Sequence, residues 1–124
     1  MEEFKVVYYA KQDGTYPAEE FIMAQEPKLQ AKILRQIFLL RQAGNKLREP
    51  DSKLLTDGIF ELRTIQGNNI ARVLYFFVIG KKIVLTNGFI KKTEKTPPLE
   101  IAKAQKYRED YLQRKEMLVD GKND

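Results

Sequence analysis

Two residue types that often carry chemistry are missing from this chain. It has no cysteine and no histidine. Without cysteine there is neither a disulfide framework nor thiol chemistry. Without histidine the chain lacks the usual general base near neutral pH and the commonest zinc ligand. Any catalysis must therefore use lysine, arginine, tyrosine, acidic side chains or hydroxyl groups.

Several sequence patterns are missing as well. The motifs GxxxxGK[ST], GxGxxG, HExxH and CxxC do not occur, so nucleotide-binding and zinc-site interpretations have no support. No apolar run approaches the length that a bilayer requires, and the N-terminal MEEFKVVYY lacks the apolar region of a signal peptide. We expect a cytoplasmic protein that does not bind membranes.

What remains is an ordinary globular composition. The 124 residues include 43% hydrophobic ones, enough for the core of a single domain, which we place at residues 1–118. The polar residues 119–124 are expected to form a disordered tail. The formal charge is +5, from 22 basic and 17 acidic residues. This excess permits a nucleic-acid partner without establishing one.

Periodicity and turn residues predict a small α+β domain. Prolines suit the first turn of a helix, Gly44 suits a helix end, and Thr96 suits the cap of a last helix. Residues 45–58 are expected to form a loop with turns. The order β-α-α-β-β-β-α predicts helices on one face of an antiparallel sheet whose other face is partly open. The expected strands span residues 4–10, 59–65, 70–79 and 82–89, and the expected helices begin at Pro17, Pro27 and Thr96.

Charged residues on the two central strands are the first candidates for a site. Alternation places Glu61 and Arg63 on one side of their strand, and Arg72 lies on a strand that is apolar on both faces. A buried guanidinium needs an acid or a ligand. Arg72 could pair with Glu61 across the strands. Alternatively, Arg63 and Arg72 could point into a concavity and bind phosphate bidentately.

A lysine-rich segment follows the last expected strand. The stretch NGFIKKTEKTPP, residues 87–98, contains Lys91, Lys92 and Lys95. These lysines could belong to a solvated connector. They could also return close to the arginines, because a meander brings strand ends together, and then complete an anion site.

The segment from Lys53 to Ala104 resembles a known family. The patterns K-L-L-x-D-G-I-F-E-L-R, A-R-V-L-Y-F-F, N-G-F-x-K-K-T-x-K-T-P and E-I-x-x-A occur in series. They are similar to the RelE/ParE toxin superfamily, in its HigB-like, often phage-associated branch, over about residues 3–114. The resemblance implies a RelE-like fold, a twisted antiparallel sheet with an N-terminal helical hairpin and a C-terminal helix.

The resemblance also implies a function. Relatives in the HigB and RelE branches are toxins of type II toxin–antitoxin systems that cleave mRNA in the ribosomal A site. A cognate helix-turn-helix antitoxin of the HigA kind neutralises them. The RNA 2′-OH attacks the adjacent phosphate, so neither a metal nor another cofactor is expected. Two alternatives stay open: a non-enzymatic, ParE-like toxin that binds DNA gyrase, and an inactive phage-derived binding protein.

Carried over by position, the resemblance assigns roles to the charged residues. Arg72 is expected on the scissile phosphate with Arg63 assisting, and Lys91 or Lys92 is expected to donate a proton or stabilise charge. Glu61 is expected either to act as a base or to orient Arg63. The residues expected to help bind the substrate are Lys95, Glu61 and Lys53.

Overall fold

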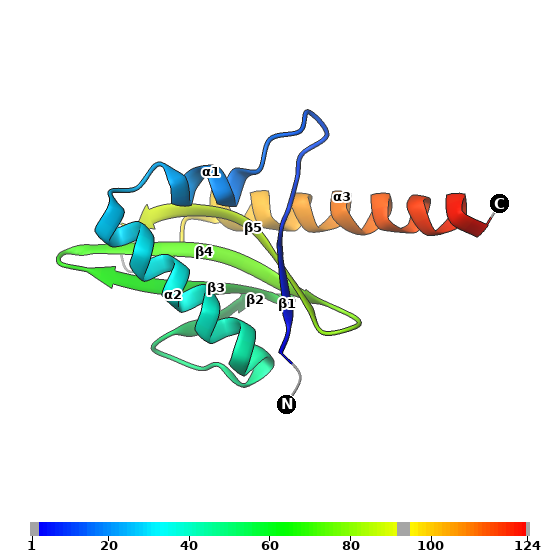
Figure 1. Cartoon of the computed structure of the whole chain (residues 1–124). Coiled ribbons are helices and arrows are strands. Elements are labelled where there is room, and N and C mark those ends of the chain that lie inside the picture. Colours follow the sequence, from blue (N-terminus) through cyan, green and yellow to red (C-terminus); the bar gives the residue numbers. More distant parts are fainter. Residues whose placement is uncertain (1–2, 92–94, 124) are drawn as a thin grey trace.

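The computed structural model describes residues 3–91 and 95–123, with side chains up to residue 115. Within these residues the chain folds as an α+β domain with a five-stranded sheet and three α-helices (Figure 1). Gly44 ends the second helix, as predicted. The elements are β1 (Lys5–Tyr8), α1 (Pro17–Met23), α2 (Pro27–Ala43), the short 3-10 helix η1 (Gly44–Lys46), β2 (Ser52–Thr56), β3 (Ile59–Gln66), β4 (Asn69–Val78), β5 (Lys82–Lys91) and α3 (Pro98–Asn123).

The sheet is mixed, and this corrects the expectation of an antiparallel sheet. Its strand order is β1-β5-β4-β3-β2. The four strands from β2 to β5 form an antiparallel meander, whereas β1 pairs with β5 in parallel. A parallel pair requires a long crossover. Helices and three strands separate β1 from β5 along the chain, so β1 can join the sheet only in the folded structure.

Strand β2 was not predicted, because the segment was expected to belong to a loop. It pairs antiparallel with β3 from Ser52 opposite Leu62. The turn that joins β2 to β3 is Asp57-Gly58, and both of its residues have positive φ angles. Positive φ at both central residues is the geometry of a tight hairpin, and Asp-Gly is one of its strongest signals. The Asp-Gly turn therefore indicates a hairpin at this point, although the short polar segment before it has no strand pattern of its own.

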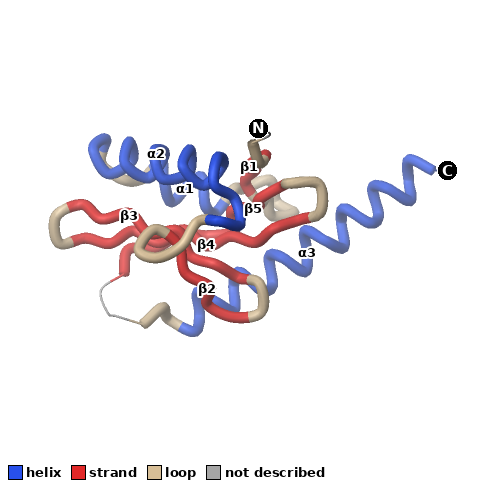
Figure 2. The backbone as a smooth tube through the Cα atoms, turned by 90° about the horizontal axis from the view of Figure 1, so that it is seen from below, coloured by secondary structure: helices blue, strands red, loops and turns tan. Residues whose placement is uncertain are grey.

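Helices cover both faces of the sheet, which corrects the expected arrangement on one face. Helices α1 and α2 pack on one face, and α3 packs on the opposite face (Figures 1 and 2). The first core includes Ile22 and Ile33 against Val73 and Tyr75. The second core places Ala104, Tyr107 and Tyr111 of α3 against Leu74, Phe76 and Val84. Strand β4 is apolar on both sides, so both of its faces need a cover.

None of the described helices is long and apolar enough to cross a membrane. Helix α3 extends to Asn123, and no side chain is described beyond residue 115, so the expected disorder of residues 119–124 stays a prediction.

Candidate functional site

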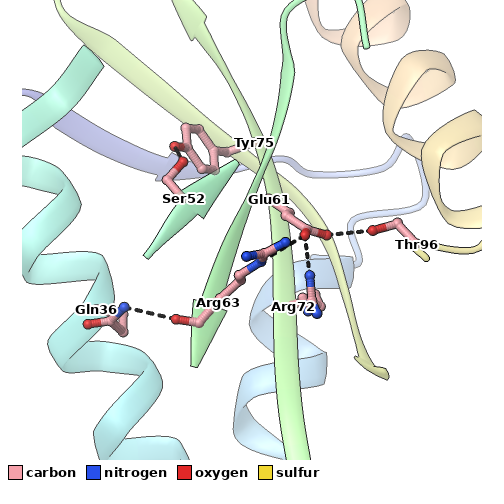
Figure 3. Close-up of polar contacts among 7 residues, drawn as sticks. All are labelled: Gln36, Ser52, Glu61, Arg63, Arg72, Tyr75 and Thr96. Atoms are coloured by element: carbon pink, nitrogen blue, oxygen red, sulfur yellow. Dashed lines mark hydrogen bonds and ion pairs between the residues drawn. The ribbon is translucent and has the colours of Figure 1, made fainter. Parts of the chain in front are cut away.

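Strand pairing brings the two predicted arginines and the glutamate together. Arg63 of β3 lies directly opposite Arg72 of β4, and Glu61 precedes Arg63 by two residues on the same face. This is the face on which α3 packs, since Arg72 alternates with Leu74 and Phe76 of the second core. Figure 3 shows both guanidinium groups turned toward the Glu61 carboxylate.

The Glu61 carboxylate is enclosed and accepts three hydrogen bonds. Its side chain is 1% exposed. Its Oε2 atom accepts from Arg63 Nε at 3.0 Å and from Arg72 Nη1, and its Oε1 atom accepts from Thr96 Oγ1 at 2.6 Å (Figure 3). The pairing of Arg72 with Glu61, one of the two alternatives that the sequence left open, is thus observed. With both oxygens occupied by donors, the carboxylate holds the two arginines in place.

Arg72 is almost completely buried. Only 4% of the residue is exposed, and its Nε atom is enclosed without a hydrogen-bond partner. Burial lowers the pKa of its guanidinium, and the Glu61 charge opposes this effect. Like charges directly opposite each other on paired strands repel. Glu61 carries one negative charge against the two arginine charges, so these three residues together keep one positive charge.

Lys91 adds a further cation to this cluster. It is the last residue of β5, lies opposite Ile70 of β4, and is 6% exposed. Burial lowers its pKa most, and the charge of Arg72 lowers it further. Arg63 also lowers this pKa, and Glu61 opposes the shift. A lysine with a lowered pKa releases its proton more readily than a lysine in water.

The other predicted lysines fall into three situations. Lys53 of β2 is exposed and lies opposite Glu61, and its charge also lowers the pKa of Lys91. Lys95 is exposed and directly precedes Thr96, whose hydroxyl reaches Glu61. Lys92 lies outside the described residues. The structure thus gathers Glu61 with cations of three adjacent strands, and places Lys53 and Lys95 at the rim.

The hydrogen bond of Thr96 to Glu61 was not predicted from the sequence. The threonine was expected to cap the last helix, but α3 begins at Pro98 and the Thr96 hydroxyl donates to Glu61 instead. The hydrogen bond joins residues 35 positions apart. A threonine just before a helix is expected to cap that helix, and the same residue can instead bond a distant carboxylate. The local sequence does not distinguish these two roles.

Two polar contacts on the opposite side support the strand that carries the site. Gln36 of α2 donates from Nε2 to the Arg63 carbonyl oxygen at 2.8 Å (Figure 3). The same nitrogen donates to Asp51 Oδ1 at 3.1 Å. The hydroxyl groups of Ser52 and Tyr75 share a buried hydrogen bond that links β2 to β4. These contacts fix the backbone at Arg63 and the strand beside Glu61. Neither was predicted.

The described residues offer an anion site rather than a metal site. They contain no group of three or more acidic side chains placed to hold a metal ion. Arginine, by contrast, presents a planar fork of donors that matches a phosphate group, and lysine supplies a compact charge. The cluster formed by Lys53, Glu61, Arg63, Arg72 and Lys91, which we call the cation cluster, is chemically suited to a phosphate or carboxylate ligand.

Comparison with known proteins agrees with this description of the chain. No curated protein matches the sequence with significance. A family model described as Phage derived protein Gp49-like (DUF891) matches residues 20–109, which contain all five residues of the cation cluster. The match covers most of the chain and includes the last part of α1, all of α2 and strands β2 to β5. The chain therefore belongs to the Gp49-like family of phage-derived proteins, within the RelE/Gp49 toxin-like family.

Proposed function

We propose that this protein is the toxin of a type II toxin–antitoxin system and cleaves mRNA on the ribosome. The observation that carries the proposal is the cation cluster, in which two arginines and a lysine surround one carboxylate whose oxygens already accept three hydrogen bonds. This arrangement leaves an excess of positive charge on one face. Membership of a RelE-related family adds independent support.

The fold supports the same proposal. A helical hairpin, an antiparallel meander and a C-terminal helix follow one another along the chain. We infer that this arrangement is RelE-like, with β1 and β2 at the two edges of the sheet. The cation cluster then occupies the central strands, where rigid neighbours hold side chains more firmly than a loop would.

The reaction that we propose needs no group beyond the protein, the RNA and water. The 2′-oxygen attacks the adjacent phosphorus and forms a new P–O bond, and the bond to the 5′-oxygen of the next nucleotide breaks. One proton passes from the 2′-hydroxyl to water, and Lys91 donates another to the departing 5′-oxygen. The protein must align the three reacting atoms and stabilise the charge on the phosphorane oxygens.

The residues of the cation cluster can divide these tasks. Arg72 and Arg63 stabilise the phosphorane, because guanidinium groups bind two phosphate oxygens at once. Lys91, whose pKa is lowered by burial and by Arg72, donates the proton to the leaving 5′-oxygen. Glu61 orients both arginines and keeps Arg72 charged in a buried position. Lys53 binds a flanking phosphate at the exposed rim.

Primer extension on mRNA from cells that express the protein tests the proposal. The wild type should produce cuts within translated codons. Arg63→Ala should remove most of these cuts while the Arg72–Glu61 pair stays in place, and Arg72→Ala should abolish them. Lys28→Ala is the matched control, because Lys28 is an exposed cation of α2 outside the cation cluster. This control variant should cleave like the wild type.

Two measurements decide how the result is understood. Circular dichroism of each variant establishes that it is folded, which matters most for Arg72→Ala because it leaves Glu61 buried without its closest partner. Arrest of DNA replication with intact mRNA would overturn the proposal and favour a gyrase-binding toxin. A helix-turn-helix reading frame beside this gene would support an antitoxin partner.

A further inference from the structure

Strand β3 has an open edge over its second half. Strand β2 pairs with β3 only as far as Ser52, which lies opposite Leu62. Strand β4 continues along β3 to the end of the hairpin, with Ile65 opposite Ile70. The second half of β3 therefore has a strand neighbour on one side only. On its other side the described residues contribute no strand.

The register shows which backbone groups face this edge. The Arg63 amide donates to the Asp51 carbonyl oxygen at 2.8 Å, and the Arg63 carbonyl oxygen accepts from Gln36, so both groups point away from β4. Groups two residues apart on a strand point the same way. The amide and carbonyl of Ile65 therefore face the open edge, and neither has a hydrogen bond to any described residue.

A basic hollow lies along this edge. Its volume is about 280 Å³. The side chain of Ile65 is 62% exposed. Three cations and one carboxylate line the hollow, and the Asp51 carboxylate already accepts a hydrogen bond from Gln36. The charge of the hollow is thus positive. Its lining residues are Lys32, Arg35, Gln36, Pro50, Asp51, Arg63, Thr64 and Ile65.

We propose that this edge binds an extended acidic segment of a protein partner, which adds to the sheet as a strand beside β3. Unpaired edge groups are a template for another strand, and such strand addition is a recurrent mode of peptide recognition. A peptide satisfies both the donor and the acceptor of Ile65, whereas an RNA phosphate can satisfy only the donor. The positive hollow selects acidic side chains, and the exposed Ile65 side chain offers an apolar contact.

Backbone pairing is tested by NMR titration of the full chain. The probe is an acetylated and amidated eight-residue peptide of alternating glutamate and valine. We expect a shift of the Ile65 amide proton and its protection from exchange with solvent. Ile65→Pro removes the donor without removing a bond to β4, and a proline is tolerated where the amide faces away from the sheet. Ile65→Thr keeps the amide and is the matched control.

Affinity is tested by calorimetry with the same peptide. Ile65→Pro should weaken binding by about tenfold, the effect of losing one net hydrogen bond, and Ile65→Thr should bind within about threefold of the wild type. The double reversal Lys32→Glu/Arg35→Glu should also weaken binding by about tenfold or more. Lys28→Glu/Lys46→Glu carries the same charge change outside the hollow and should bind like the wild type.

Three results would overturn the inference. The first is peptide affinity that is unchanged in Ile65→Pro or, should that variant not fold, in the Lys32→Glu/Arg35→Glu variant. The second is a shift of the Ile65 amide by hexauridylate but not by the peptide, which would assign the hollow to RNA. The third is a dimer of the chain, seen by sedimentation equilibrium, that Ile65→Pro dissolves, because the edge would then pair with a second copy.

Peptide binding at this edge has a consequence for the cation cluster. Arg63 lines the hollow and also donates from Nε to Glu61. A bound segment should therefore slow mRNA cleavage, and this consequence rests on the proposed function. The NMR and calorimetric tests do not depend on it. A protein that binds the peptide but cuts no RNA would refute the proposed function and leave the binding edge intact.

Discussion

Glu61→Gln tests the electrostatic basis of the site most directly. The substitution keeps the shape of the side chain but removes the carboxylate that bonds both arginines within the described part of the chain. Arg72, which is 4% exposed, then becomes a buried charge without a counter-charge, directly opposite the charge of Arg63. We expect the folded protein to become much less stable.

The expected magnitude follows from the burial of the pair. Removing one partner of a buried ion pair costs about 3–5 kcal/mol, because the other charge stays desolvated. For a domain of this size such a loss lowers the Tm by about 10–20 °C. Exposed ion pairs contribute only about 0–1 kcal/mol. Glu3→Gln, which breaks the exposed pair between Glu3 and Arg41, should therefore change the Tm little.

Urea unfolding followed by circular dichroism measures these differences. The wild type, Glu61→Gln, Glu3→Gln and the double variant Glu61→Gln/Arg72→Met form the set. The double variant should recover about 2 kcal/mol or more relative to Glu61→Gln, because an apolar side chain replaces the uncompensated buried charge. A free energy of unfolding for Glu61→Gln within about 1 kcal/mol of the wild type would refute the reasoning.

Three further predictions concern single residues. Burial and nearby cations lower the pKa of Lys91 in the folded protein, so the unfolded chain binds more protons as the pH approaches 10.5. The free energy of unfolding should therefore rise over this pH range. Urea titrations at several pH values should show that Lys91→Met loses this rise. Tyr75→Phe leaves the buried Ser52 hydroxyl unpaired and should cost about 1–3 kcal/mol in thermal unfolding, whereas unchanged stability would argue against that hydrogen bond. Gly88→Ala brings a methyl group against the Phe21 ring and should cost about 1–3 kcal/mol, and a variant as stable as the wild type would contradict this close packing.

Local periodicity was sufficient for much of the fold. A helix was predicted to begin at Pro27, and α2 begins there and buries Leu29, Ile33 and Ile37 in the first core. Alternation along β3 and β4 predicted that Glu61 and Arg63 share a face, and the register confirms it. These predictions succeed because the side-chain periods of helices and strands are fixed by backbone geometry.

Other features depend on contacts between distant segments, which local patterns do not encode. Strand β2 is short and polar, and pairing with β3 and the Ser52–Tyr75 hydrogen bond define it. The parallel position of β1 and the placement of α3 on the second face likewise depend on how far-apart segments assemble. A sequence pattern shows which face of an element is apolar, but not which partner covers it.

The sequence by itself determined the kinds of chemistry that are open to this protein. A chain without cysteine and histidine must rely for any catalysis on lysine, arginine, tyrosine, acidic side chains or hydroxyl groups, and Arg63, Arg72 and Lys91 are its candidates for charge stabilisation. Only the tertiary structure decided that Thr96 and both arginines meet at one enclosed carboxylate, and that the Ile65 edge stays open. The physical reason is that burial and strand register arise from long-range packing, and these two properties set the charge and the accessibility of every group in the site.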